Sequence, residues 1–477
     1  MIRVLSVASE CAPLVKTGGL ADVTGALPAA LAEQDVEMRV LLPGYPRVMA
    51  AVEAGDPVLV EEDLFGGPAR VRPARGAGLD LLVIDAPHLY DRPGAIYLGP
   101  DGRDWPDNPE RFAALSWLAA RIGADGAGGW FPQVLHCHDW QGGLAPLYLR
   151  QAGASGRVKS VLTIHNVAFH GFAPEDRLER LRLPRSAWQP EGLEYYGRIS
   201  ALKAGCVYAD KLTTVSPTYA RELMTPQFGM GMEGVLRQRR ADLSGILNGI
   251  DTAVWDPAAD PQIARPYDTP AGKVANKAAL VAELGLPEGE GPLAVVISRL
   301  TEQKGLDMLL WALSRYLEGG GRLALLGTGD AGLERAWQDA AVSNPGLAVR
   351  IGYDEALSHR MMAGADAILV PSRFEPCGLT QLYGLRYGTV PVVALTGGLA
   401  DTVIAANDAG LRAGAATGLQ FHPVSAASLA DALERLCDLY RQPDLWDGLR
   451  SRAMRHPVGW EVSAGQYAEL YRGLAAA

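Results

Sequence analysis

Two stretches in the second half of the chain combine charged residues with glycine or proline directly after apolar segments. Arg299 and Lys304 stand in SRLTEQKG, and Glu375 stands in RFEPCGLTQ. Two cations that converge on a diphosphate can neutralise it without a metal ion. The first stretch therefore predicts a binding site for a phosphate-containing ligand. The alternative is that Arg299 and Lys304 are simply solvated at the surface.

Glu375 comes directly before a helix that the sequence predicts to begin near Gly378. The first N–H groups of a helix have no partner inside it and readily bind anions. Here the backbone of Gly378, Leu379 and Thr380 would supply them. A carboxylate beside a bound anion is unfavourable unless it has a use, so we expect Glu375 to accept hydrogen bonds from sugar hydroxyls. The alternative is a glutamate that only caps the helix.

The string HCHDW invites a comparison with metal sites. On a strand, His136 and His138 would face one side, and Cys137 and Asp139 the other. No second group of ligands accompanies them, and the sequence contains no D-x-D string, no Walker A string and no G-x-S-x-G string. We therefore expect neither a metal ion nor a cofactor.

The string GTGDAG at 327–332 matches G-x-G-x-x-G, and Asp354 lies about twenty residues further on. A dinucleotide-binding domain has this pattern, but so does any tight turn from a strand into a helix. The charged loops of the same half suit a diphosphate held by cations better than a nicotinamide cofactor.

The six residues TGGLAD occur twice, at 17–22 and at 396–401. Glycine lets a backbone approach a ligand closely because it has no side chain. We interpret each copy as a glycine turn that brings N–H groups near a ligand just before a helix. One copy would come from each of two similar domains that face one deep cleft.

Size and charge limit the possible functions. A chain of 477 residues favours two or three domains, and 48% hydrophobic with 21% charged residues is typical of a globular protein. The formal net charge of −10 argues against nucleic acid or an anionic membrane as a partner. The chain has five cysteines without a C-x-x-C pair, no signal-peptide pattern and no apolar run of ~18 residues, which predicts a cytoplasmic protein.

Apolar segments alternate with helix-like segments in both halves, which indicates parallel sheets covered on both faces. The predicted strands are 3–9, 37–43, 133–139, 160–166, 211–216, 244–249, 292–298, 322–327, 347–352, 367–372 and 390–395. The alternation is interrupted by a β-rich insertion near 55–105 and by a Pro- and Asp-rich stretch after 248. The sequence thus predicts an α/β protein with Rossmann-like, doubly wound domains at 1–248 and 249–457. A last helix within 458–477 would pack back on the first domain.

Several strings together resemble bacterial glycogen synthase and plastid starch synthase. They are KTGGLADV, HCHDW, TIHNVAFHG, LNGID, SRLTEQKGLD, PSRFEPCGLTQLYGLRYGT and TGGLADTV, and they span nearly the whole chain in family order. The resemblance implies two Rossmann-like domains of the GT-B type. It also implies transfer of glucose from ADP-glucose to the non-reducing end of an α-1,4-glucan, such as glycogen or a maltooligosaccharide. The reaction would retain configuration and need no metal.

The resemblance also implies roles for particular residues. It assigns the donor phosphates to Lys16, Gly18, Gly19, Arg299, Lys304 and the N–H groups of Leu379 and Thr380. It assigns adenine to Tyr353 and the glucose hydroxyls to Glu375. It places on the sugar and acceptor side Asp139, His165, Asn248 and Trp140, and it marks Asp22, Cys377 and Gly378 as further substrate contacts. Among these, Glu375, Arg299, Lys304, His165 and Asp139 are the expected catalytic residues.

One departure bears on mechanism. Many retaining glycosyltransferases carry a second glutamate eight positions after the first, where this chain has Tyr383. Retention by double displacement needs two carboxylates about 5 Å apart, so a front-face displacement is favoured. Two alternatives stay open: another retaining transferase that uses UDP-glucose or a small sugar acceptor, and a glucan-binding protein without activity.

Overall fold

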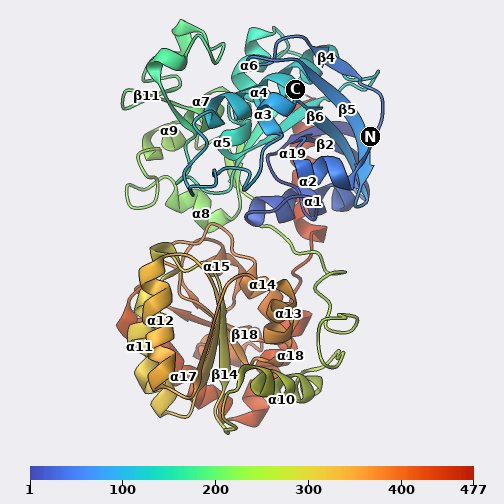
Figure 1. Ribbon diagram of the computed structural model, residues 1–477. Helices are drawn as coiled ribbons and strands as arrows, with labels where there is room; N and C mark the ends of the chain where they lie inside the picture. The colour runs from blue at the N-terminus through green and yellow to red at the C-terminus, as the bar shows by residue number, and fades with distance from the viewer. Residues whose placement is uncertain (477) are drawn as a thin grey trace. The chain divides into compact units, whose positions relative to one another are not determined.

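The structure, a computed structural model, describes residues 1–476. The chain forms two compact units (Figure 1). The first contains Met1–Asn248 and the C-terminal segment that begins at Trp460, and the second is Gly249–Gly459. Each unit has its own parallel sheet and its own hydrophobic core.

The first unit is built on a sheet whose strand order reverses near its middle. Its parallel strands are, in spatial order, β13 (Leu243–Gly245), β12 (Lys211–Thr214), β8 (Lys159–Ile164), β7 (Val134–His138), β1 (Ile2–Val7), β2 (Val36–Pro43) and β6 (Leu79–Asp85). The chain continues from β1 to β2 on one side and later adds β7 and β8 on the other. The loops after β1 and β7 therefore start side by side at the carboxyl edge, which is where open α/β sheets bind ligands.

The segment after β2 widens this sheet. β5 (Ala69–Gly76) pairs antiparallel with β6, while β3 (Glu53–Ala54) and β4 (Leu59–Glu61) pair with β5. Because β6 pairs in parallel with β2, the β-rich stretch expected near 55–105 belongs to the edge of the main sheet as far as Asp85, and the residues after it form α3 (Pro87–Tyr90) and loops. A small antiparallel sheet follows later, made of β9 (Phe172–Pro174), β10 (Glu194–Tyr195) and β11 (Arg198–Ser200).

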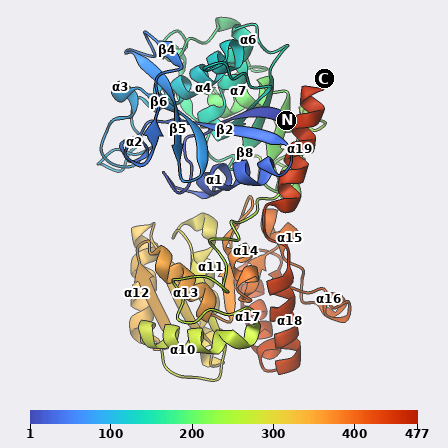
Figure 2. The same ribbon diagram turned by 90° about the vertical axis from the view of Figure 1, so that its right-hand side faces the viewer.

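Helices surround the first sheet, and the last helix of the chain is among them. The others are α1 (Gly19–Ala32), α2 (Pro46–Ala51), α3 (Pro87–Tyr90), α4 (Asn108–Asp125), α5 (Asp139–Gly142), α6 (Ala145–Gln151), α7 (Ala201–Tyr208), α8 (Pro217–Glu222) and α9 (Glu233–Gln238). Helix α19 (Glu461–Ala475) lies beside α1 (Figure 2) and also contacts β1 and β7. Its apolar residues recur every three or four positions, so Tyr467 and Tyr471 are fully buried against α1.

The second unit repeats the architecture with six parallel strands. Their order is β16 (Leu347–Ile351), β15 (Arg322–Gly327), β14 (Leu293–Ile297), β17 (Ala367–Val370), β18 (Val390–Ala394) and β19 (Leu419–Phe421). The order reverses between β14 and β17, so the loops that carry Arg299 and Glu375 begin at this reversal. The short strand β19 was not among the predicted strands, because three residues between polar turns have no clear alternation.

One helix of the second unit precedes its first strand, and the others follow the strands. The helices are α10 (Lys273–Leu284), α11 (Leu306–Glu318), α12 (Ala331–Ser343), α13 (Glu355–Gly364), α14 (Thr380–Arg386), α15 (Gly397–Thr402), α16 (Asp408–Arg412), α17 (Ala426–Tyr440) and α18 (Pro443–Arg455). The Pro-rich stretch after 248 is anchored by Trp255, whose ring stacks on His359 at 3.9 Å and on Tyr383 at 3.8 Å between centroids. Tyr383, at the position of the missing second glutamate, is thus a buried packing residue.

Candidate functional site

Glu375 is held at the strand-order reversal of the second unit by two side chains. Its Oε2 atom accepts hydrogen bonds from Lys304 Nζ at 2.6 Å and from Ser372 Oγ at 2.8 Å. The residue is only 6% exposed. A buried carboxylate of this kind needs a charged partner, and Lys304, which follows β14, supplies it. Ser372 could have been noticed in the sequence as a hydroxyl three residues before Glu375.

The turn after Glu375 differs from the expectation in where its helix begins. Gly378 has a left-handed φ of +74°, Leu379 is the N-cap, and α14 starts at Thr380. The helix therefore begins two residues later than predicted, because the left-handed glycine interrupts the helical path. Cys377 is buried in this turn.

Two further residues of this unit that were expected to bind the nucleotide sugar, Arg299 and Tyr353, are exposed. Arg299 follows β14, and its guanidinium has no ion-pair partner among the residues that the structure describes. Tyr353 follows β16, its side chain is 74% exposed, and its hydroxyl donates to Glu355 Oε2 at 2.6 Å.

A carboxylate that the sequence reading missed organises the loop after β1. Glu10 is buried, and its Oε2 accepts the N–H groups of Thr17 at 2.5 Å and Gly18 at 3.1 Å. Tyr97 donates its hydroxyl to Glu10 Oε1 at 2.6 Å. Burial raises the pKa of Glu10. The N–H of Gly18 is thus engaged by the protein itself. The signal in the sequence was an acidic residue directly after a buried strand.

The remaining residues of this loop sit at the start of α1. Gly18 is its N-cap and Gly19 its first residue. Lys16 pairs with Asp22 in the first turn, with 2.7 Å between Nζ and Oδ1, and both side chains are partly exposed. Lys16 therefore stays accessible at a helix N-terminus, which favours bound anions.

Asp139 lies at the end of β7 but not on it. It is the first residue of α5 and has a positive φ of 50°, so the expected alternation of the strand stops at His138. Its Oδ1 accepts the N–H of His165 at 2.7 Å and that of Asn166 at 3.3 Å. Burial raises the pKa of Asp139 to about 7, and the nearby Glu10 carboxylate adds to this shift. The two acids of this unit therefore influence each other.

His165 belongs to a chain of neutral imidazoles. Its Nε2 lies 3.0 Å from His138 Nδ1, and His138 Nε2 lies 3.1 Å from Ser6 Oγ. The ring of His136 lies tilted against that of His138, with 4.2 Å between their centroids, and His136 Nδ1 lies 2.7 Å from the Tyr471 hydroxyl of α19. Removal from water lowers the pKa of His165 to about 3, so its ring is uncharged at neutral pH. His138, which sequence reasoning assigned no role, orients this ring.

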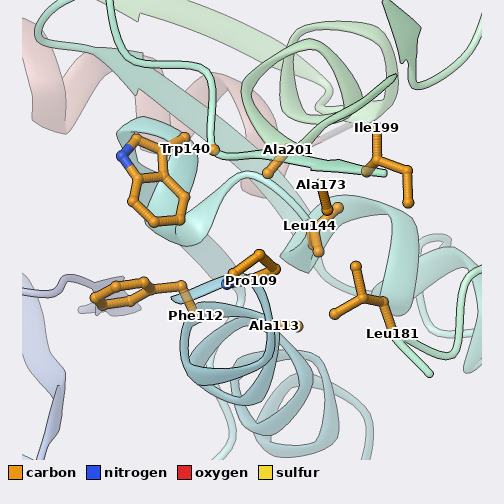
Figure 3. A pocket seen from close by; sticks show the side chains of 10 residues that line it. Pro109, Phe112, Ala113, Trp140, Leu144, Ala173, Leu181, Ile199 and Ala201 are labelled. Atoms are coloured by element: carbon orange, nitrogen blue, oxygen red, sulfur yellow. The ribbon is translucent and has the colours of Figure 1, made fainter. Parts of the chain in front are cut away.

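The Trp140 ring packs against apolar residues. Its ring meets Phe112 edge-on at 4.9 Å between centroids, and Gly171, with φ +63°, crosses it so closely that a Cβ there would lie 2.2 Å from the indole. Figure 3 shows Trp140 and Phe112 at one end of a pocket whose other lining residues are Pro109, Ala113, Leu144, Gly171, Ala173, Leu181, Ile199 and Ala201. No polar side chain lines it, so it supports Trp140 rather than binding a sugar.

Asn248 ends the first unit with an unused acceptor. The residue is 7% exposed, and its Oδ1 atom has no hydrogen-bond partner among the described residues. Buried polar atoms are nearly always paired. Asn248 is therefore a good candidate for a ligand contact, as the sequence predicted.

Two glycine motifs have structural explanations. In GTGDAG, a Cβ on Gly329 would lie 2.3 Å from the Leu300 carbonyl oxygen, and Asp330 caps α12 by accepting the N–H groups of Gly332 and Leu333. The tight-turn interpretation is therefore favoured. In the second TGGLAD copy, the Gly398 N–H donates to the carbonyls of Glu375 and Pro376. The expectation that this N–H faces a ligand is wrong, because it serves the Glu375 turn instead.

The described residues contain neither a metal-binding cluster nor a membrane-spanning helix. Within residues 1–476, no group of three or more His, Cys, Asp and Glu side chains is arranged to hold a metal ion. No helix in this range is long and apolar enough to cross a membrane. All five cysteines are buried, and no disulfide bond joins any of them within the described residues.

Comparison with known proteins gives consistent matches. Residues 3–238 match the family model of the starch synthase catalytic domain, and residues 291–438 match glycosyl transferases group 1. The chain is 65% identical to a glycogen synthase of Paracoccus denitrificans (strain Pd 1222) over 477 residues, 100% of both chains. It is 59% identical to a glycogen synthase of Jannaschia sp. (strain CCS1), again over 100% of both chains. These matches confirm the resemblance that the motifs indicated.

Solved structures confirm the predicted fold class. The catalytic domain of Starch Synthase IV from Arabidopsis thaliana, bound to ADP and acarbose, matches with a TM-score of 0.89, 31% identity and 100% coverage of both chains. A sucrose-phosphate synthase from Thermosynechococcus elongatus matches with a TM-score of 0.60 and 18% identity, also over 100% of both chains. The second likeness concerns the fold alone.

Proposed function

Since this chain belongs to the glycogen synthase family of glycosyltransferases, we propose that it transfers glucose from ADP-glucose to the non-reducing end of an α-1,4-glucan, with retention of anomeric configuration. The observation that carries the proposal is the buried Glu375 carboxylate, paired with Lys304 and Ser372 where the strand order of the second sheet reverses. Such a group has the charge and position to bind sugar hydroxyls beside a phosphate. Buried cysteines that form no disulfide bond within the described residues suit the cytoplasm as its location.

The donor diphosphate would be neutralised by cations from both units. Arg299 and Lys304 would contact it from the second unit, together with the N–H groups of Leu379 and Thr380. Lys16 would contact it from the first unit beside the Gly18–Gly19 turn, with Asp22 holding the lysine. An ammonium carries three donors, so Lys304 can keep its bond to Glu375 and still contact a phosphate oxygen. The exposed ring of Tyr353 would stack on adenine.

The sugar and the acceptor would meet groups of the first unit. Asp139, Asn248 and Trp140 would contact glucose or the glucan, and the backbone carbonyl of His165 would stabilise positive charge on the sugar ring. The neutral ring of His165 supports this role, because an imidazolium would repel a cationic transition state. We further propose that the two units close on the donor when it binds, so that Lys16 and Arg299 both contact its diphosphate and water is excluded.

The reaction would be a front-face displacement. The bond from the anomeric carbon to the leaving phosphate oxygen breaks, and the acceptor hydroxyl bonds to the same face of the sugar. The leaving phosphate oxygen takes the hydroxyl proton, so the products are ADP and a glucan longer by one glucose. The protein contributes positioning and electrostatic stabilisation of both partial charges.

One assay separates this proposal from the two alternatives. Purified protein is mixed with glycogen or glucose as acceptor and ADP-glucose or UDP-glucose as donor, and the released nucleotide is measured. We expect release with ADP-glucose and glycogen only. Comparable turnover on UDP-glucose, or on the monosaccharide, would favour the other transferase. Glucan binding without release from either donor would favour the inactive binding protein.

A further inference from the structure

The second TGGLAD copy lies directly against the turn that carries Glu375. It follows β18, and its two glycines open α15. A Cβ on Gly397 would lie 1.9 Å from the Glu375 carbonyl oxygen, and one on Gly398 would lie 2.2 Å from the Cys377 carbonyl oxygen. Both contacts are with backbone, which cannot move aside as a flexible side chain can. Only glycine fits at either position while the turn keeps its present path.

Two groups hold four consecutive carbonyls of this turn. The Gly398 N–H donates to Glu375 O at 3.0 Å and to Pro376 O at 3.1 Å. Gln381 Nε2 donates to Cys377 O at 3.0 Å and to Gly378 O at 2.9 Å. The same amide nitrogen lies 3.2 Å from the Thr402 hydroxyl of α15. Gln381 therefore also contacts the helix that contains Gly398.

The carbonyl directions determine the directions of the N–H groups. In a trans peptide the C=O and the following N–H point to opposite sides. With the carbonyls of 376, 377 and 378 held toward α15 and Gln381, the N–H groups of Cys377, Gly378 and Leu379 point away from them. The side chain of Glu375 is held separately, by Lys304 and Ser372.

We infer that the glycine pair of the second TGGLAD copy and Gln381 are positioning residues for the Glu375 turn. They set the backbone path that places the Glu375 carboxylate and orients the N–H groups of the turn, and they do not contact the ligand themselves. The inference rests on the proposed function, in which this turn binds the donor. The two copies also differ in their surroundings: the first glycine of the first copy, Gly18, donates its N–H to the Glu10 side chain, whereas the second glycine of the second copy, Gly398, donates its N–H to the backbone beside Glu375.

The test compares Gly398→Ala with a matched control in the same unit. Gly291 lies two residues before β14, at the amino ends of the strands and thus away from the Glu375 turn, and a Cβ there would lie 2.0 Å from the Gly320 carbonyl oxygen. Both substitutions should lower the melting temperature. Only Gly398→Ala should lower turnover per folded molecule, by about tenfold or more, and weaken ADP binding, because displacement of a catalytic group by about 1 Å can cost ~10²-fold.

A second readout does not depend on activity. Cys377 is buried within the turn, so a displaced turn should expose its thiol to a thiol-specific reagent, located by peptide mapping. We expect faster labelling of Cys377 in Gly398→Ala than in Gly291→Ala or the parent protein. Gln381→Met removes the donors to Cys377 and Gly378 without adding charge, and should change labelling, turnover and ADP affinity in the same direction. If Gly398→Ala does not fold, Gln381→Met carries the test.

The outcomes are distinguishable. Turnover, ADP affinity and Cys377 labelling that all match the Gly291→Ala control would overturn the inference, and so would a labelled Cys377 with unchanged turnover. If the parent protein transfers glucose from no nucleotide donor, the proposed function fails. Labelling and ADP affinity then still decide whether these residues hold the turn.

Discussion

Glu375 shows how one buried charge can be useful at the residue scale. Lys304 and Ser372 both bond to its Oε2 atom, which leaves Oε1 as the oxygen for a sugar hydroxyl. A glutamine at this position keeps the size and an acceptor oxygen, but it removes the negative charge that would favour a cationic sugar ring.

We predict that Glu375→Gln folds, keeps its affinity for ADP and loses turnover by about 10²-fold or more, or about 2.7 kcal/mol of transition-state stabilisation. ADP affinity should stay the same or rise, because Lys304 is released for the phosphates. Melting temperature, ADP affinity and turnover are measured on one preparation. Glu283→Gln, which breaks an exposed pair with Arg360, is the control. Near-normal turnover would remove Glu375 from the proposed site.

Asp139 should make stability depend on pH. Its folded-state pKa is about 7, whereas an unfolded Asp has a pKa of about 3.9. The folded state therefore holds the proton more tightly, so this contribution is fully present below pH ~4 and is lost as the pH rises through ~7, with a slope of at most about 1.4 kcal/mol per pH unit. Asp139→Asn removes this titration.

We predict that the free energy of unfolding of the parent protein, relative to Asp139→Asn, falls between pH 5 and 8. Denaturant unfolding at several pH values measures it. Asp242→Asn is a control in which the pKa shift has the opposite sign, because hydrogen bonds from Lys211 and Arg239 lower the pKa of Asp242. The difference in free energy of unfolding between the parent protein and Asp242→Asn should stay constant in this pH range. A flat difference for Asp139→Asn as well would contradict the prediction.

At the scale of elements, α19 is a structural part of the first unit. Its Tyr471 is fully buried and bonds to His136, whose other ring nitrogen lies 2.6 Å from Thr163 Oγ1. The helix therefore reaches the same row of histidines that ends at His165. The helix that follows the whole second unit in the sequence thus supports the core of the first unit.

We predict that Tyr471→Phe lowers the free energy of unfolding by about 1–3 kcal/mol, because it leaves a buried ring nitrogen of His136 without a partner. Denaturant unfolding measures this loss. Tyr196→Phe, at a side chain that is 83% exposed, should change stability very little. An equal effect of the two substitutions would mean that the bond between Tyr471 and His136 contributes nothing.

At the scale of the whole molecule, the proposed reaction needs cations from both units. We predict that a chelator such as EDTA does not abolish activity, because Lys16, Arg299 and Lys304 would neutralise the diphosphate. Nucleotide release is measured with and without EDTA, and again after magnesium is added. Complete loss on chelation, restored by the metal, would contradict the metal-free mechanism.

The same requirement predicts a change of shape on binding. ADP-glucose together with an acceptor should reduce the radius of gyration measured by X-ray scattering, because Lys16 and Arg299 must reach one diphosphate. Lys16→Ala should weaken this response, since it removes the contact from the first unit. An unchanged scattering profile of the parent protein at saturating ligand would argue against closure.

The sequence by itself determined the alternation of strands and helices, the positions of charged loops after strands, and the family, because these features are local patterns or strings. It could not determine which amides and charges pair with one another. The bonds of Glu10 to the Gly18 turn, of Lys304 to Glu375 and of Tyr471 to His136 depend on how strands order themselves in a sheet. The start of α14 at Thr380 and the role of the second TGGLAD copy were likewise decided by tertiary structure, since a left-handed glycine and a close backbone contact make sense only against the neighbouring chain. The two identical hexapeptides thus lie in different surroundings, the first beside the Glu10 side chain and the second against the backbone of the Glu375 turn.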